Sequence, residues 1–259
     1  MNPSRRPLIL GNWKMFNGGR SGVELAEGCV AFARDLPDVD VVIAPPFTVL
    51  AAVADTIDGS PVRLAGQNLF PKDQGAYTGE ISGPMLEECG CTSVIVGHSE
   101  RRAIFNEANS FVAEKAAAAL AHDLMPVICV GETLKEREAG ETLRIVKQEV
   151  EAFLDIIAQT STAVAIAYEP VWAIGTGKVA GPSEAEEVHA AIRTWLENKD
   201  PALAQRTRIL YGGSGKPDNA AALLACPNVD GFLVGGASLD AASFGAIARA
   251  ARSKSGASG

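Results

Sequence analysis

Short apolar runs recur along the chain and alternate with longer segments of helical periodicity. The runs are Leu8–Leu10, Val39–Ala44, Val62–Ala65, Ser93–Val96, Pro126–Val130, Ala163–Ala167, Arg208–Leu210 and Gly231–Val234. Short runs of this kind, most of them rich in Val, Ile and Leu, are typical of buried strands. Because strands that alternate with helices pair in parallel, the pattern predicts a closed (β/α)8 TIM barrel.

Two of the intervening segments carry one apolar face at helical spacing. The first face comprises Leu143, Val146, Val150, Phe153 and Ile157, and the second Val188, Ala191, Ile192 and Trp195. Such spacing predicts amphipathic helices. The second helix has two candidate starts. Ser183 and Glu186 can form a capping box, or Gly181 can cap a helix with Pro182 in its first turn.

The chain of 259 residues is expected to form one domain, because α/β barrels of this length are single units. The rival fold is an open doubly wound sheet. Its glycine-rich fingerprint is missing after the first strand, where Gly11-Asn12-Trp13-Lys14 stands instead. From about residue 253 the Ser- and Gly-rich tail is expected to be disordered.

Charge and cysteine usage narrow the function. Lys and Arg total 23 against 31 Asp and Glu, a net charge of −8, which argues against a nucleic-acid or membrane binder. Five cysteines fit no disulfide or zinc spacing. No run approaches the length of a membrane span or a signal-peptide core. The sequence therefore predicts a cytoplasmic protein.

Polar residues follow the predicted strands where each one ends. They are Asn12 and Lys14 after the first strand, His98 after the fourth, Glu169 after the sixth, Tyr211-Gly212-Gly213-Ser214 after the seventh and Gly235-Gly236 after the eighth. In a barrel these ends share one rim, which is where active sites of this architecture lie.

Glu169 and His98 are candidates for acid–base chemistry. Pro170 biases Glu169 away from helix, so its carboxylate is expected at a strand end. His98 precedes a predicted helix start, whose positive end is expected to lower the imidazole pKa and keep the ring neutral. Lys14 can attract an anionic substrate, pair with Glu100, or do both. The alternatives are a turn glutamate, a core histidine and a surface lysine.

A loop and two glycine-rich turns complete the candidate site. The loop Val171-Trp172-Ala173-Ile174-Gly175-Thr176-Gly177-Lys178 mixes apolar residues with glycines, as a lid that closes over a site would. The alternative is a loop packed on a neighbouring helix. The turns after the seventh and eighth strands lie where barrels often bind phosphate; ordinary turns are the alternative.

Together these motifs resemble the triosephosphate isomerase family from about Leu8 to Arg249. The resemblance rests on Gly11-Asn12-Trp13-Lys14-Met15, Gly75-Ala76-Tyr77-Thr78-Gly79-Glu80, Val96-Gly97-His98-Ser99-Glu100-Arg101-Arg102, Cys129-Val130-Gly131-Glu132-Thr133, Tyr168-Glu169-Pro170 with the lid, Tyr211-Gly212-Gly213-Ser214 and Val234-Gly235-Gly236. It implies interconversion of dihydroxyacetone phosphate and D-glyceraldehyde 3-phosphate, a step that glycolysis and gluconeogenesis share, without metal or organic cofactor.

The resemblance also implies residue roles. Glu169 would move the proton between C1 and C2, and neutral His98 would polarise the carbonyl. Asn12 and Lys14 would bind substrate, with Glu100 tied to Lys14. Backbone N–H groups would hold the phosphate at Gly175, Ser214, Gly235 and Gly236. Tyr211 and Ser214 would bond to the closed lid.

A homodimer is implied as well. Its interface would contain the segment 67–80, with Thr78 reaching the partner's Asn12 and Lys14 region, and Arg101 and Glu107 in support. Phe16 stands where the family often has Asn, which bears on the interface rather than the chemistry. Two rival functions are a Schiff-base aldolase, which needs a buried lysine at a central strand end, and a non-catalytic scaffold.

Overall fold

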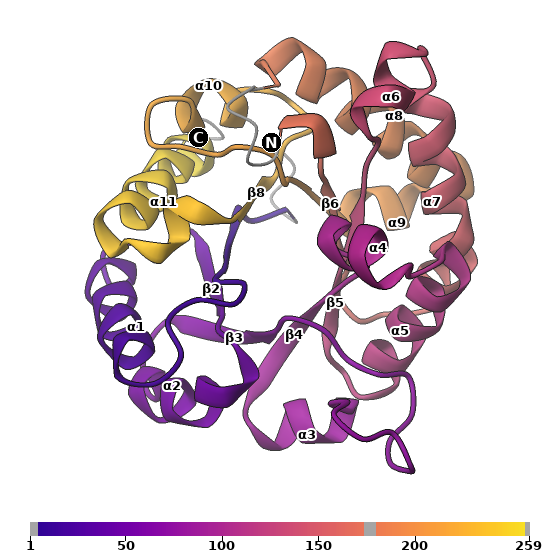
Figure 1. The fold of residues 1–259 in the computed structure, drawn as a ribbon. Coiled ribbons are helices and arrows are strands. Elements are labelled where there is room, and N and C mark those ends of the chain that lie inside the picture. Colours follow the sequence, from indigo (N-terminus) through magenta and orange to yellow (C-terminus); the bar gives the residue numbers. More distant parts are fainter. Residues whose placement is uncertain (1–4, 174–179, 257–259) are drawn as a thin grey trace.

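The computed structural model describes residues 5–173 and 180–256. In this part of the chain, parallel strands close into one barrel, and Figure 1 shows the strands at the centre with the helices around them. The strands are β1 (Leu8–Asn12), β2 (Asp40–Ala44), β3 (Val62–Gly66), β4 (Cys91–Val96), β5 (Met125–Val130), β6 (Ala165–Tyr168), β7 (Arg208–Tyr211) and β8 (Gly231–Val234). The predicted (β/α)8 barrel is confirmed.

The helices follow the strands in order. They are α1 (Arg20–Ala33), α2 (Leu50–Ile57), α3 (Gly83–Glu88), α4 (Ser99–Phe105), α5 (Asn109–Ala121), α6 (Leu134–Glu138), α7 (Thr142–Ala158), α8 (Pro182–Lys199), α9 (Pro201–Arg206), α10 (Ala220–Leu224) and α11 (Ala241–Gly256). Short 3-10 turns occupy Phe47–Val49, Val171–Ala173 and Gly236–Leu239. Helix α11 runs past residue 253, because a helix already formed extends through Ser and Gly more easily than it starts there.

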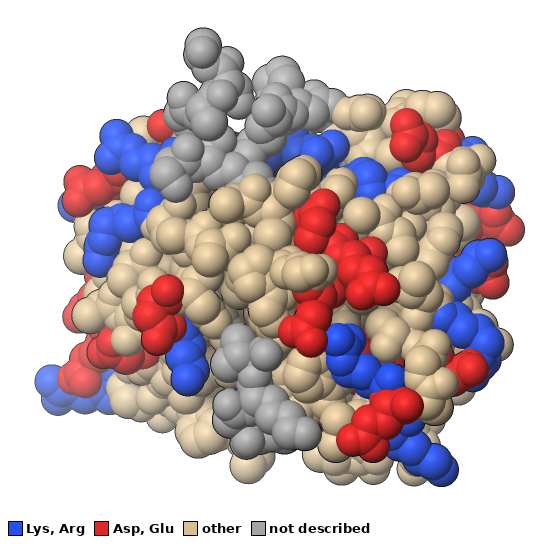
Figure 2. Space-filling model, turned by 90° about the horizontal axis from the view of Figure 1, so that it is seen from above, with Lys and Arg blue, Asp and Glu red and all other residues tan. Residues whose placement is uncertain are grey.

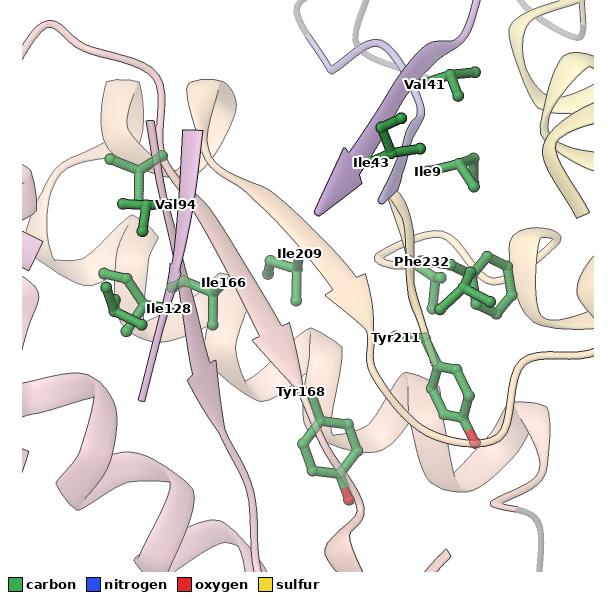
Figure 3. Packing of buried hydrophobic residues seen from close by; sticks show 14 of the residues in the cluster. Ile9, Val41, Ile43, Val94, Ile128, Ile166, Tyr168, Ile209, Tyr211 and Phe232 are labelled. Carbon is green, nitrogen blue, oxygen red and sulfur yellow. The ribbon is translucent and has the colours of Figure 1, made fainter. Parts of the chain in front are cut away.

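Alternation along each strand divides the core into two layers. Ile9, Val41, Ile43 and Ile166 belong to the layer that also contains the buried helix side chains, and Figure 3 shows them on the strands of this layer. Their neighbours in sequence, such as Leu10, Val42 and Ala167, fill the barrel interior. Both faces of the sheet are therefore buried, which is why the strands read as apolar runs.

Two helices show how far periodicity reaches. In α7, Val146, Val150, Phe153 and Ile157 are buried as expected, but Leu143 is 39% exposed because it lies in the first turn, beyond the reach of the sheet. Helix α8 takes the second of its two candidate starts. Gly181 is the cap, its N–H donates to the Glu184 carboxylate at 2.7 Å, and Pro182 opens the first turn.

Buried ion pairs tie together the amino-terminal ends of the strands. Arg208 of β7 donates to Asp40 of β2 at 2.7 Å, and Asp230 accepts from Arg5 and Arg193. These bonds join elements on different sides of the barrel mouth opposite the candidate site. They leave the carboxyl ends of the strands free for chemistry.

The outer surface is mixed in charge. Figure 2 shows one side on which acidic side chains gather at the centre, while lysines and arginines lie mostly towards the edges. This side offers no continuous basic surface to a polyanion. Within the described residues, no helix is both long and apolar enough to cross a bilayer.

Truncation of one α7 core residue should measure the sheet–helix layer. Phe153 is 1% exposed, so Phe153→Ala should lower the free energy of unfolding by about 3–5 kcal/mol through lost burial and the cavity left behind. Denaturant unfolding at fixed protein concentration measures the change. Leu143→Ala on the same helix is the control and should cost less than about 1 kcal/mol; equal losses would contradict the assigned helix face.

Candidate active site

The carboxyl ends of β1, β4 and β6 bring Lys14, His98 and Glu169 to one cavity. Glu169 follows β6 directly, and its backbone N–H continues the ladder by donating to the Val130 carbonyl at 2.7 Å. His98 caps α4, so β4 and the first turn of that helix fix its position. The cavity of about 460 Å³ is lined by all three residues.

Glu169 and His98 are in direct contact. Oε1 of Glu169 lies 3.0 Å from Nε2 of His98. Oε2 accepts the backbone N–H of Ser99 at 2.8 Å, the first residue of α4. The carboxylate is 2% exposed, so the imidazole of His98 and the N–H at the start of α4 replace water as its hydrogen-bond donors.

The other imidazole nitrogen defines the tautomer. Nδ1 of His98 accepts the backbone N–H of Glu100 at 3.2 Å. An acceptor nitrogen carries no proton, so the ring that satisfies this bond has its proton on Nε2 and presents Nε2–H to the cavity side. The helix start that the sequence predicted after His98 is therefore present and supplies this donor.

The expected fall in the His98 pKa is wrong for this arrangement. Burial disfavours the imidazolium, but the Glu169 carboxylate against Nε2 favours it and raises the pKa of His98 from its ordinary value. For Glu169, burial disfavours the carboxylate, yet His98 and the Ser99 N–H outweigh it and lower the pKa. The sequence could suggest the helix start but not the carboxylate that faces it.

Lys14 is held by a network of its own. Its Nζ lies 2.6 Å from Oε1 of Glu100, the pairing expected from the sequence. Its backbone has φ of 51°, a left-handed conformation that side chains other than glycine rarely adopt. Asn12 Oδ1 accepts the Lys14 N–H at 3.0 Å, and Gln67 donates to the Lys14 carbonyl at 2.8 Å. These bonds stabilise the strained turn.

The glycine-rich turns after β7 and β8 form the rest of the cavity wall. Asn12, Ser214, Gly235 and Gly236 all line it. A Cβ at Gly212 would lie 2.8 Å from Cγ of Glu169, so this turn approaches the carboxylate as only glycine permits. Gly175, the remaining residue expected to bind phosphate, lies outside the described residues.

The predicted lid is described at its first residues only. Val171–Ala173 form a 3-10 turn, and Trp172 Nε1 donates to Glu132 at 2.8 Å. Arg137 stacks over the Trp172 ring at 4.5 Å. Ile174, Gly175, Thr176, Gly177 and Lys178 lie outside the described residues. Of the two residues expected to latch the lid, Tyr211 donates to the Ala180 carbonyl at 3.3 Å, and Ser214 lines the cavity.

The residues expected at a dimer interface lie apart from the cavity. Thr78 is exposed in the long loop between β3 and α3, which projects from the barrel in Figure 1. Arg101 donates to Glu107 at 2.6 Å, and Glu107 also accepts from buried Lys115. Thr78 is thus exposed on a projecting loop, whereas Arg101 and Glu107 form an ion pair with each other.

Several site residues escaped the sequence reasoning. Ser99 contributes a backbone N–H, which no side-chain pattern reveals. Gln67 directly follows β3, and a polar residue after an apolar run was the available signal, but this signal does not reveal its contact with Lys14. Glu132 is fully buried and accepts from Tyr168 and Trp172; an acidic residue directly after a strand was the available signal.

A titratable pair at the carboxyl rim of a closed barrel, next to a lysine and two glycine-rich turns, defines an enzyme that moves protons on a small anionic substrate. The profile of the triosephosphate isomerase family matches residues 7–251. Proteins named triosephosphate isomerase from Chloroflexus aurantiacus and Rhodopirellula baltica are 50% and 48% identical, over 93% and 96% of this chain and 97% and 99% of their own. A third, from Herminiimonas arsenicoxydans, is 50% identical over 95% of this chain and its whole length. The chain belongs to the triosephosphate isomerase family, and the predicted enzyme class is confirmed.

The contact between the two titratable groups makes a spectroscopic prediction. In Glu169→Gln the largest cause that raises the pKa of His98 is removed, while Glu100 still raises it and burial and Lys14 still lower it, so the imidazole should titrate at lower pH than in the wild type. Imidazole resonances in NMR spectra measure the shift, with the ring signals of His122 as internal control. An unchanged His98 titration would contradict the contact.

Proposed function

We propose that this chain interconverts dihydroxyacetone phosphate and D-glyceraldehyde 3-phosphate by proton transfer through an enediolate. The single observation that carries the proposal is the 3.0 Å contact of Glu169 with His98 in a cavity that Lys14 also lines. Isomerisation needs a base for a carbon-bound proton and a donor for the adjacent oxygens. Glu169 and His98 supply these two groups from different strands.

Glu169 becomes a stronger base when it turns from α4 to the substrate. In its present position the imidazole and the Ser99 N–H lower its pKa. A carboxylate that leaves these donors but stays out of water loses that stabilisation and keeps the cost of burial. Its affinity for a proton rises where the substrate carbon lies. The protonated carboxyl then returns the proton to the neighbouring carbon.

His98 acts as a neutral donor in the same step. Once Glu169 turns away, its raising effect on the His98 pKa is lost, so that Glu100 alone raises this pKa against burial and Lys14, while the Glu100 N–H still occupies Nδ1. The ring then stays uncharged, and Nε2–H donates to the carbonyl oxygen as charge develops on it. The carbonyl oxygen on which negative charge develops differs between the two substrates, but the two oxygens are on neighbouring carbons. One imidazole can therefore donate a hydrogen bond to either of them.

Lys14 and the glycine-rich turns suit the anionic parts of the substrate. Lys14 adds a positive charge close to the developing enediolate, and Glu100 holds its ammonium in place. Backbone N–H groups at Ser214, Gly235 and Gly236 can donate hydrogen bonds to a phosphate without desolvating a further side-chain charge. Closure of the segment 171–178 would exclude water, which protects an enediolate from losing its phosphate.

The aldolase alternative is weaker for a physical reason. A Schiff-base lysine must present its amine to a carbonyl carbon, whereas Nζ of Lys14 lies 2.6 Å from the Glu100 carboxylate and is held there. Borohydride reduction in the presence of substrate distinguishes the two reactions, since only the aldolase is trapped covalently. A non-catalytic scaffold would show no turnover at all.

We further propose a homodimer in the cytoplasm. Large apolar side chains are exposed at Met15, Phe16, Tyr77, Met85, Ile104 and Phe105. They come from segments after β1, β3 and β4, the segments expected to meet a partner, and exposed apolar side chains of this size favour association. All five cysteines are free thiols, which suits a reducing compartment.

Loss of the base should abolish most turnover without unfolding the protein. Glu169→Gln keeps volume and two hydrogen-bonding atoms but cannot take the proton, so kcat should fall by roughly 10²–10⁴ or more. An assay coupled to reduction or oxidation of a nicotinamide cofactor, run in both directions, measures it. Glu151→Gln, on the exposed face of α7, is the control. A Glu169→Gln rate within a few-fold of the control sinks the assignment.

A charge at the expected interface should dissociate the dimer. Thr78→Arg adds a long cation where a partner would cover the loop, and its burial without an anion is unfavourable. Sedimentation velocity should show a shift towards monomer at low protein concentration. Thr194→Arg, an exposed position of α8, should leave the dimer intact. Equal association states in the two variants would move the interface elsewhere.

A further inference from the structure

A buried ion pair between helices α4 and α7 takes no part in the proposed chemistry. It joins Arg102 of α4 to Glu149 of α7, with Nη1 and Oε1 3.4 Å apart. The two side chains are only 15% and 10% exposed. Charges so far from water need hydrogen-bonding partners, and both groups find such partners on backbone close to His98 and Glu169.

Arg102 connects the ends of two strands. Its Nε donates to the carbonyl of Gly97 at 2.8 Å, directly before His98. Its Nη2 donates to the carbonyl of Cys129 in β5 at 3.1 Å. Asn109 gives a further acceptor at 2.5 Å. The guanidinium therefore has three acceptors besides Glu149.

Glu149 has one strong bond, to the backbone N–H of Gly131, which Oε2 accepts at 2.7 Å. Gly131 lies against the backbone of Glu169, since a Cβ there would be 1.8 Å from the Glu169 carbonyl oxygen. The residues on each side of Gly131 accept from the same segment. Val130 accepts the Glu169 N–H at 2.7 Å, and Glu132 accepts the Val171 N–H at 3.1 Å.

We propose that Glu149 is a positioning residue for Glu169, acting through the Gly131 N–H. By fixing the Gly131 peptide, it fixes the strand end on which the backbone of the catalytic carboxylate rests. The inference rests on the proposed function. It requires a hydrogen-bond acceptor at position 149 rather than a negative charge, because Arg102 keeps its other three acceptors.

The charge of Glu149 gives an independent readout. Burial raises the pKa of Glu149 to about 7, against the lowering effects of Arg102 and the Gly131 N–H and with further raising by Glu136 and Glu169. The folded protein thus binds a proton that the unfolded chain releases near the ordinary carboxyl pKa of 4.5. The contribution to stability is full below that value and is lost as pH rises through about 7.

Three variants separate acceptor, charge and helix. Glu149→Leu removes the acceptor, Glu149→Gln keeps a neutral one, and Glu151→Leu, exposed on the same helix, is the control. In Glu149→Leu, kcat should fall roughly 10- to 100-fold, the scale of a misplaced catalytic group, with KM nearly unchanged. Glu149→Gln should restore kcat to within a few-fold of wild type. The melting temperature of Glu149→Gln should rise relative to that of the wild type as the pH increases from 4.5 to about 7.

Two results would overturn the proposal while the wild type remains active. One is a Glu149→Leu rate equal to that of the control, and the other is a Glu149→Gln rate as low as that of Glu149→Leu. An inactive wild type would instead sink the proposed function. Should Glu149→Leu fail to fold, the Gly131 amide resonance carries the test. It should follow the Glu149 titration in the wild type and stay constant in Glu149→Gln, and a resonance that ignores this titration refutes the bond.

Discussion

The catalytic site depends on one contact, the carboxylate of Glu169 against the start of α4. A carboxylate that is 2% exposed remains ionised only because donors replace water, and here the donors are Ser99 N–H and His98. The same donors restrain the carboxylate from acting as a base. The hydrogen bonds that stabilise the buried carboxylate of Glu169 thus also make it a weaker base. In the reaction proposed above, the substrate resolves this opposition between stability and basicity by giving the carboxylate a new position while water stays excluded.

The barrel makes that contact possible between residues far apart in sequence. Ser99 and Glu169 are 70 positions apart, yet parallel pairing sets both at the same rim. Arg208–Asp40 and Arg193–Asp230 fasten the opposite mouth, where no residue expected to bind substrate lies. Stabilising ion pairs and reactive groups therefore occupy opposite ends of the strands. Strain such as the left-handed backbone of Lys14 can persist because the remainder of the barrel fixes it.

The features that could be predicted from the sequence are those that depend on the type of side chain and on the spacing of apolar residues. Apolar runs located every strand, and polar residues at their ends located Asn12, Lys14, His98 and Glu169 in the wall of one cavity. Prediction from the sequence failed where the partner is distant or is backbone. The pKa of His98 is raised by a carboxylate at the end of another strand. The start of α8 at Gly181 depends on a bond from the Gly181 N–H to the Glu184 carboxylate. Leu143 had the right spacing, but it lies in the first turn of α7 and remains 39% exposed. Glu149 gave no signal, since a helical glutamate is usually solvated.

A net charge of −8 does not prevent an anion from binding at this rim. Charges on the outer helices act over about 8–10 Å in physiological salt, whereas Lys14 and the residues of the glycine-rich turns line the cavity directly. Of the cations lining the cavity, Lys14 is already paired with Glu100, so much of the positive potential must come from peptide dipoles and from Lys216. Dipoles cost no desolvated charge when the site is empty. An acidic outer surface is compatible with the anionic substrate proposed above, because the cations and peptide groups of the cavity wall would lie closer to that anion than the outer charges do.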